Sequence, residues 1–146
     1  MMQAPAHLHP AVAQSLDQWH TLVAHKDLDA LEALVHPDAV FRSPMAFNPY
    51  SPAPALLLAL RTVITIFQDF AYHRQFASGD GLNVVLEFSA VVDGKQLKGI
   101  DMIRFDEQGR IVEFEVMIRP LNALQALGAE MGARLGQVLP GFKQKA

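Results

Sequence analysis

The sequence contains no cysteine, and only 18% of its 146 residues are charged. The absence of cysteine excludes disulfides, thiolate metal sites and a cysteine nucleophile, and it fits a cytoplasmic protein. A net charge of −3 gives no basic surface for nucleic acid. No apolar run approaches the roughly 20 residues of a membrane span, and the N-terminus lacks the pattern of a signal peptide. We therefore expect a cytoplasmic protein that binds neither nucleic acid nor membranes.

Common catalytic signatures are missing as well. The chain has no Gly-x-Ser-x-Gly elbow, phosphate loop, dinucleotide fingerprint or His-Glu-x-x-His motif. His7 and His9 lie on an N-terminal segment with no third metal ligand nearby in the sequence. These absences predict no metal site and no cofactor.

Hydrophobic residues are abundant, since they make up 51% of the chain. A chain of this length can form one domain with a full core. The high apolar fraction indicates a large core, a lined cavity or an apolar partner surface. We expect a flexible arm over residues 1–10, a single domain over 11–136 and a tail over 137–146.

The first half of the chain has helical periodicity. Trp19 belongs to the apolar stripe of the first helix, Asp27 is a candidate N-cap of the second, and Phe67 lies on the buried side of the third. The helices are expected over residues 11–25, 28–35 and 55–68. A short strand is expected over residues 39–43.

A proline-rich loop over residues 44–54 separates the short strand from the third helix. Four prolines exclude a helix or a central strand there. The loop carries Met45, Phe47 and Tyr50, whose exposure to water would be costly. We therefore expect it to fold over an apolar feature of the protein.

From Phe70 onward the period of the pattern changes from helical to two. Turn signals divide this part into consecutive strands, and a final amphipathic helix follows. The strands are expected over residues 70–78, 82–92, 95–106 and 110–119, and the helix over 121–136. Helices followed by an antiparallel meander predict an α+β domain with helices on one face of a sheet.

The last hairpin, residues 99–120, contains the main anomaly of the sequence. We prefer the register that places Arg104 opposite Glu113 and Phe105 opposite Val112, which also places Asp101 opposite Val116. A carboxylate then shares a face with apolar side chains, which is rare without a reason. The apolar members of this face include Ile103, Phe105, Phe114 and Ile118.

The run Gly-Ile-Asp-Met-Ile-Arg-Phe-Asp-x-x-Gly-Arg-Ile-Val within this hairpin resembles the last hairpin of the ketosteroid isomerases and of SnoaL-like proteins. Both belong to the superfamily named after nuclear transport factor 2. The resemblance covers roughly residues 10 to 120. It implies a cone-shaped curved antiparallel sheet wrapped around three N-terminal helices, with a C-terminal helix in addition. The superfamily hosts isomerases, dehydratases, epoxide hydrolases, cyclases and non-catalytic binding modules.

The resemblance also implies roles for single positions. Asp101 matches the protonated aspartate that donates a hydrogen bond to the enolate oxygen in the isomerases. Trp19 stands in place of the tyrosine that is the second donor, and Ser43 stands in place of the aspartate that is the general base. A serine cannot take a proton from carbon unaided. This chain therefore keeps the cavity carboxyl and lacks the family's base.

Asp101 has two interpretations from the sequence. It is either an acid or base in an apolar pocket, with a pKa raised by desolvation, or a structural aspartate bonded to Trp19 or a backbone amide. His36 and His73 are the remaining candidate bases, His36 at a corner before the short strand and His73 on the outer face of the sheet. Glu87 is expected on the outer face as well.

We expect Asp101 to be the catalytic residue if the protein is an enzyme, and cofactor-free acid–base chemistry on a small, largely apolar, oxygenated ligand. A non-catalytic ligand-binding or protein-interaction module is the alternative. Apolar residues among charges on the outer sheet face predict a homodimer. The expected ligand contacts are Trp19, Ser43, Met45, Tyr50, Phe67, Ile103, Phe114, Val116, Ile118 and, through the Ile-Arg-Pro ending that resembles the family, Arg119.

Overall fold

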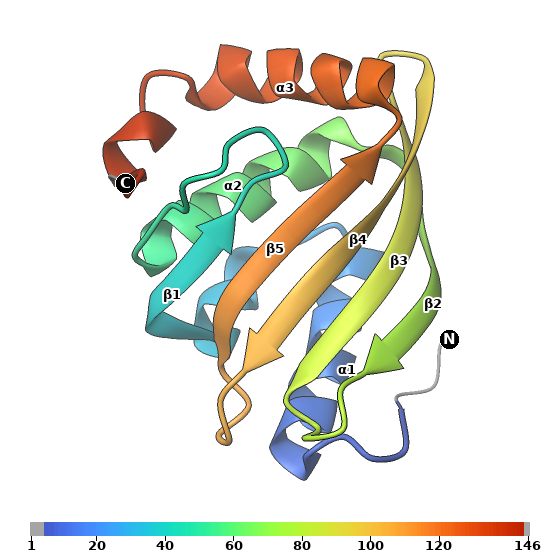
Figure 1. The fold of residues 1–146 in the computed structure, drawn as a ribbon, viewed down its shortest axis with the longest axis vertical. Coiled ribbons are helices and arrows are strands. Elements are labelled where there is room, and N and C mark those ends of the chain that lie inside the picture. Colours follow the sequence, from blue (N-terminus) through green and yellow to red (C-terminus); the bar gives the residue numbers. More distant parts are fainter. Residues whose placement is uncertain (1–4, 145–146) are drawn as a thin grey trace.

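The structure is a computed structural model that describes residues 5–144. Two helices, one strand and a further helix come first, and four strands in succession follow (Figure 1). The elements are α1 (Pro10–Ala24), the 3-10 helix η1 (Asp29–Leu34), β1 (Val35–Arg42), α2 (Ala53–Ile66), β2 (Gln68–Ala77), β3 (Asn83–Val92), β4 (Lys95–Phe105), β5 (Ile111–Arg119), α3 (Leu121–Leu135) and the 3-10 helix η2 (Leu139–Phe142).

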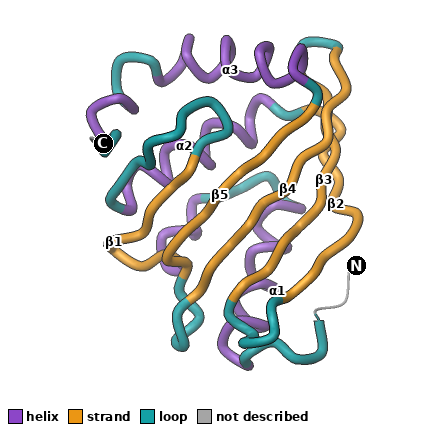
Figure 2. The backbone as a smooth tube through the Cα atoms, viewed as in Figure 1, coloured by secondary structure: helices purple, strands orange, loops and turns teal. Residues whose placement is uncertain are grey.

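A five-stranded curved sheet with the order β1-β5-β4-β3-β2 forms the body of the fold. Strands β2 to β5 are an antiparallel meander, and β1 pairs with β5 in parallel. Helices α1 and α2 lie against one side of the sheet, and α3 crosses one end of it (Figures 1 and 2). This arrangement confirms the predicted α+β cone and the meander without a helix between residues 79 and 120.

The main core lies between the concave face of the sheet and the helices. Its fully buried side chains come from α1, η1, α2, β1 and the three central strands, and most follow the amphipathic patterns of their elements. They include Leu16, Leu56, Leu86, Ile103, Phe105, Ile111 and Phe114. A second cluster around Phe88 and Leu127 connects the sheet to α3.

Two elements of the first half differ from the prediction. The second helix is a 3-10 helix, and β1 begins at Val35 rather than at Ala39. Strand β1 includes Pro37, which is tolerated because β1 is an edge strand and its pairing is irregular between Val35 and Val40.

Irregular pairing also explains two wrong predictions of face and register. Arg104 pairs with Glu113 and Asp101 with Val116, as predicted, but Phe105 pairs with Ile111 instead of Val112 because the register shifts after Arg104. A β-bulge inserts one extra residue, so the alternation of inward and outward side chains is interrupted there and resumes beyond it.

The second such shift lies between Tyr72 and Gln75 on β2. The pattern predicts that Tyr72, Arg74 and Phe76 share one face of the sheet. In the structure Tyr72 points to the interior, whereas Arg74 pairs with Glu87 on the outer face. The shift therefore turns Arg74 and Phe76 to the outer face, whereas Tyr72 keeps the inner face that alternation gives it and contacts Asp101.

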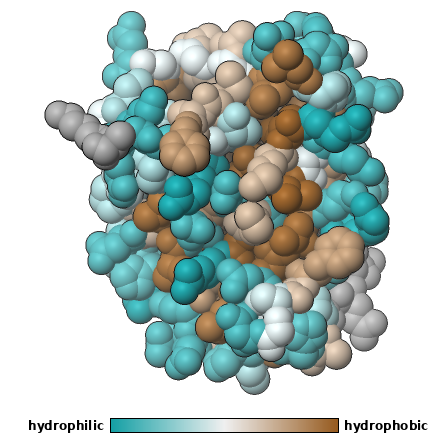
Figure 3. Space-filling view, viewed as in Figure 1, coloured by the Kyte–Doolittle hydropathy of each residue, from teal (hydrophilic) through white to brown (hydrophobic). Residues whose placement is uncertain are grey.

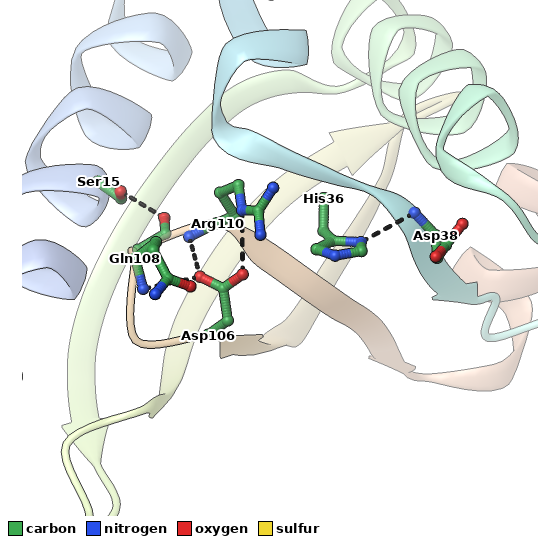
Figure 4. Close-up of polar contacts among 7 residues, drawn as sticks. Ser15, His36, Asp38, Asp106, Gln108 and Arg110 are labelled. Carbon is green, nitrogen blue, oxygen red and sulfur yellow. Dashed lines mark hydrogen bonds and ion pairs between the residues drawn. The ribbon is translucent and has the colours of Figure 1, made fainter.

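The β4–β5 turn is tied to α1 by a hydrogen bond (Figure 4). Ser15 on α1 donates a hydrogen bond to the carbonyl of Gly109, whose φ of +81° is the left-handed conformation expected of this hairpin glycine. Asp106 accepts bonds from the backbone N–H groups of Gln108 and Arg110 and from the Arg110 guanidinium. This turn fixes the relative positions of α1 and the strand that carries Asp101.

Both chain ends contact the domain where the structure describes them. Leu8 is buried, and the N–H of His9 donates to the carbonyl of Gly81. Near the other end, Tyr50 forms bridges to both Phe41 and Lys143. Residues 1–4 of the expected arm and 145–146 of the expected tail lie outside the described residues. Across residues 5–144, no helix has the length and apolar character needed to cross a membrane.

Candidate functional site

A largely apolar cavity of about 220 Å³ lies between the concave face of the sheet and the helices. Its walls come from α1, α2, α3, the loop after β1 and the inner faces of β2, β4 and β5. An apolar cavity of about 150 Å³ is large enough to bind benzene, so this space is of ligand size. Most small-molecule sites have this character, with few polar groups on an apolar wall.

Asp101 is the only acidic side chain among the described residues that line the cavity. It lies on β4, where alternation places Gly99, Asp101 and Ile103 on the inner face. Only 6% of its surface is accessible to solvent. The sequence therefore forces a carboxyl group into an apolar interior, where it needs a hydrogen-bond partner or a proton.

Asp101 is part of a chain of three hydrogen-bonded side chains. The Tyr72 hydroxyl donates to Asp101 Oδ2 at 2.6 Å, and the Trp19 indole N–H donates to the Tyr72 hydroxyl oxygen at 3.1 Å. The rings of Phe70 and His20 meet the Tyr72 ring edge-on, with centroids at 4.9 and 5.2 Å. Aromatic packing thus fixes the tyrosine that contacts the carboxyl.

Burial has the largest effect on the pKa values of Asp101 and Tyr72. It raises the pKa of Asp101 to about 7, although the hydrogen bond from Tyr72 acts in the opposite direction. Burial, and then the adjacent Asp101 carboxylate, raise the pKa of Tyr72 well above its usual value of 10. The upward direction for Asp101 is the one that the sequence predicts. Asp101 therefore changes protonation near neutral pH, whereas Tyr72 stays protonated.

Most of the predicted ligand contacts meet at this cavity. Eight of the eleven predicted site residues line it: Trp19, Ser43, Met45, Tyr50, Phe67, Asp101, Val116 and Ile118. The structure places Ile103 and Phe114 in the packed core, without access to solvent. The Phe114 ring packs edge-on against the Trp19 ring, with the two ring centroids 5.4 Å apart. Arg119 is exposed and lies opposite Lys98 in the register of β4 and β5, and it does not line the cavity.

The partners of these residues differ in part from the expectation. Asp101 bonds to Tyr72 rather than to Trp19 or a backbone amide, and the Trp19 N–H is occupied by Tyr72. Ser43 Oγ accepts a bond from the N–H of Met45, which shapes the start of the proline-rich loop. Met45 in turn rests on Gly128, because a Cβ atom at that glycine would lie 2.5 Å from Met45 Cε.

The other titratable candidates lie away from the cavity. His36 accepts a bond from the N–H of Asp38 in β1 (Figure 4), and His73 contacts Ser89. Glu87 lies on the outer face, as predicted, where Arg74 and then Lys98 lower its pKa to about 2 although burial opposes them. Within residues 5–144, no three histidine or acidic side chains converge to hold a metal ion.

Two parts of the site were not found from the sequence. Alternation places Tyr72 on the inner face, opposite to that of His73, but its hydrogen bond to Asp101 was not predicted. The apolar stripe of α3 was predicted, but not its position over the cavity, where Leu127, Met131 and Leu135 form one wall. The only sequence signal for Tyr72 was a tyrosine within an aromatic strand segment. The sequence did not show that Asp101 is its hydrogen-bond partner.

A family model and a similar solved structure agree on the family of this chain. The model of the SnoaL-like domain family matches residues 16–114. The chain resembles a crystal structure of a steroid delta-isomerase from Pseudomonas aeruginosa at 61% identity and a TM-score of 0.87, covering 91% of this chain and 97% of the other. No curated protein matches the chain significantly.

More distant structures support the fold. An uncharacterized bacterial protein with a cystatin-like fold from Silicibacter pomeroyi is 27% identical, with a TM-score of 0.80 and 92% coverage of both chains. The epoxide hydrolase/cyclase-like enzyme SalBIII, described for pyran ring formation in the polyether salinomycin, is 15% identical. Its TM-score is 0.62, with 75% of this chain and 91% of the other covered. The second likeness concerns the fold alone.

Proposed function

Since the chain belongs to the SnoaL-like domain family, we propose that its cavity binds a small, largely apolar molecule and that Asp101 donates a hydrogen bond or a proton to an oxygen atom of that molecule. One observation carries the proposal: a single carboxyl group, hydrogen-bonded to Tyr72, on an otherwise apolar cavity wall. A carboxylic acid that stays neutral at such a wall is a hydrogen-bond donor.

The chemistry that fits this arrangement is acid-type activation without a cofactor. Donation to a carbonyl or ether oxygen withdraws electrons from the neighbouring carbon, so that a C–H bond becomes more acidic or a C–O bond breaks more easily. A pKa of about 7 suits a group that gives or takes a proton near neutral pH. The 61% identical protein named a steroid delta-isomerase makes isomerisation of an unsaturated ketone the first reaction to test.

A β,γ-unsaturated ketosteroid is the appropriate probe, because its isomerisation to the conjugated enone is visible by ultraviolet absorbance. Because Ser43 supplies no base, the C–H proton would have to pass to water, and wild-type turnover that is lost in Asp101→Leu would support acid-type activation by Asp101. Binding is measured separately through the fluorescence of Trp19, the single tryptophan of the chain and part of the cavity wall. Absence of any fluorescence change with apolar ketones would contradict the proposed binding site.

A cavity-filling variant shows whether the ligand occupies this space. Gly132 lines the cavity on α3, and a Cβ atom there would meet open space within 4 Å. Gly132→Leu should therefore reduce ketosteroid binding at least about tenfold, while helix propensity favours its folding. Gly79→Leu is the control, because Gly79 also has open space around it but lies in an exposed turn. Equal binding by both variants would place the ligand elsewhere.

A non-catalytic binding protein is the second candidate function. The observation that favours it is Ser43, which lines the cavity where the resembling isomerases have their general base. Apart from Asp101, the titratable groups among the described lining residues are the hydroxyls of Tyr50 and Tyr72. Ketosteroid binding without turnover would favour this candidate over the enzyme.

We also propose that the protein forms a homodimer through the outer face of the sheet. On that face Met117 is 44% exposed, and Val85, Val91, Ile100 and Met102 are half-buried. Figure 3, from the same side as Figure 1, shows apolar side chains interspersed with polar ones. A two-fold contact would cover this surface. Light scattering should give twice the chain mass of 16.1 kDa, and a mass near 16.1 kDa at micromolar concentration would contradict the dimer.

A further inference from the structure

We infer that Tyr72, held by Trp19, is a positioning residue that keeps the acidic proton of Asp101 on Oδ1, directed into the cavity. This inference rests on the proposed function for its consequence, but the hydrogen-bond arrangement itself is a property of the free protein. It assigns a role to a residue outside the positions that carry the family resemblance.

The direction of the hydrogen bonds follows from the chemistry of the three groups. An indole N–H only donates, so the contact at 3.1 Å makes the Tyr72 oxygen the acceptor. The tyrosine has one hydrogen left to donate, and Asp101 Oδ2 lies 2.6 Å away. This distance is in the range of about 2.5–2.7 Å for a hydroxyl that donates to a carboxylate oxygen.

The two oxygens of Asp101 are therefore not equivalent. Oδ2 accepts from Tyr72, whereas Oδ1 has no hydrogen-bond partner among residues 5–144. In that part of the chain, every fully buried side-chain nitrogen or oxygen has a partner, so Oδ1 is not sealed inside the protein. Asp101 lines the cavity, and Oδ1 is the atom that opens to it. When Asp101 is neutral, its proton consequently lies on Oδ1.

This arrangement restricts the ligand. The Tyr72 hydrogen is used by Asp101, so a ligand oxygen in the cavity receives its hydrogen bond from Asp101 and not from Tyr72. In the isomerases that the chain resembles, a tyrosine and an aspartate both donate to the ligand oxygen. The ligand favoured here is a neutral acceptor such as a ketone, ether or epoxide, which accepts its hydrogen bond at this position from the carboxyl.

The side chains that pack against the Tyr72 ring are aromatic. Tyr50 is the other titratable group on the described cavity wall, and His20 packs against the Tyr72 ring. Burial lowers the pKa of His20, although Gln75 and Asp17 oppose this, which disfavours a positive charge beside Tyr72. Phe70 and Phe88 also contact the Tyr72 ring and are apolar.

The sign of one pKa change distinguishes the proposed direction from its reverse. If Tyr72 donates to Asp101, its hydroxyl stabilises the carboxylate, and Tyr72→Phe should raise the pKa of Asp101 by about one to two units. If Asp101 instead donates to Tyr72, the hydroxyl stabilises the neutral acid, and the same change should lower that pKa. Carbonyl-carbon NMR titration of the full chain measures the shift directly.

Two further variants keep the test decisive. Tyr50→Phe removes the other cavity phenol, which has no hydrogen bond to Asp101, and should leave the titration of Asp101 in place. Trp19→Phe removes the donor to Tyr72 and should raise the pKa of Asp101 by less than Tyr72→Phe does. Should Tyr72→Phe fail to fold, Trp19→Phe is the variant to titrate. A lowered or unchanged pKa of Asp101 in Tyr72→Phe would overturn the inference. A merely structural role of Tyr72 would lower the melting temperature without raising the pKa of Asp101.

The ligand test is separate from the titration. Failure of the protein to bind any ketone would remove the proposed function without changing the pKa order of the free variants. Conversely, ketone binding with an unshifted Asp101 titration in Tyr72→Phe would keep the proposed function and reject the positioning role of Tyr72.

Discussion

Asp101→Asn should leave the free energy of unfolding nearly unchanged at about pH 4 and make the protein more stable than wild type at about pH 8. Asparagine has the shape of the neutral acid, retains an oxygen for the Tyr72 hydroxyl and cannot ionise. Burial raises the pKa of Asp101 from 3.8 to about 7 in the folded protein. At about 1.36 kcal/mol per pKa unit, the stability gap at high pH is up to roughly 4 kcal/mol.

The sign follows from proton binding. Between its unfolded pKa near 3.8 and its folded pKa near 7, Asp101 holds a proton more tightly in the folded state. Wild-type stability from this group is therefore complete below the lower value and is lost as the pH rises through the higher one. Urea unfolding of both proteins at equal concentration, at several pH values across this window, measures the gap.

Asp106→Asn is a control with the opposite expected sign. Burial tends to raise the pKa of Asp106, but the backbone and guanidinium of Arg110 outweigh it and lower that pKa (Figure 4). Replacing this carboxylate should make the protein less stable at neutral pH, with a deficit that shrinks in acid. A gap between wild type and Asp101→Asn that does not depend on pH would show that Asp101 ionises at its ordinary value.

Asp101→Leu should weaken the binding of a ketone by about 1 to 3 kcal/mol, or roughly 5- to 150-fold, because the ligand oxygen loses its donor in an apolar site. Asp101→Asn should bind nearly as well as wild type, since its amide N–H can replace the proton on Oδ1. The probe is α-tetralone, and tetralin, which lacks the oxygen, is the matched control ligand. Trp19 fluorescence measures both affinities.

The pH dependence of these affinities adds a second criterion. Wild-type binding of α-tetralone should fall as the pH rises through about 7, because the ionised carboxylate cannot donate. Binding by Asp101→Asn should be independent of pH in this range, and tetralin should bind all three proteins alike. Equal loss of tetralin and tetralone binding in Asp101→Leu would indicate a structural role for Asp101 instead.

Local patterns in the sequence were sufficient for much of the fold and for the central residue of the site. The alternation of β4 and β5, with a glycine turn between them, placed Asp101 opposite Val116 on an inward face. Alternation is a property of neighbouring residues, so it can be read without the rest of the chain. The same local rule failed where a bulge shifts the pairing, as for Phe105 and for Arg74.

Only the tertiary structure determined which side chains Asp101 meets and how the cavity is closed. Trp19 and Tyr72 are 53 residues apart, and Tyr72 and Asp101 are 29 apart. Contacts over such distances depend on the curvature of the sheet and on the packing of whole elements, which no local pattern encodes. The apolar stripe of α3 predicted that this helix is buried, but its position beside the cavity depends on where β5 ends and on the space that α2 and the sheet leave open. The sequence by itself thus determined that a carboxyl group faces the interior, and the tertiary packing decided that this carboxyl has a tyrosine partner and an open cavity in front of it.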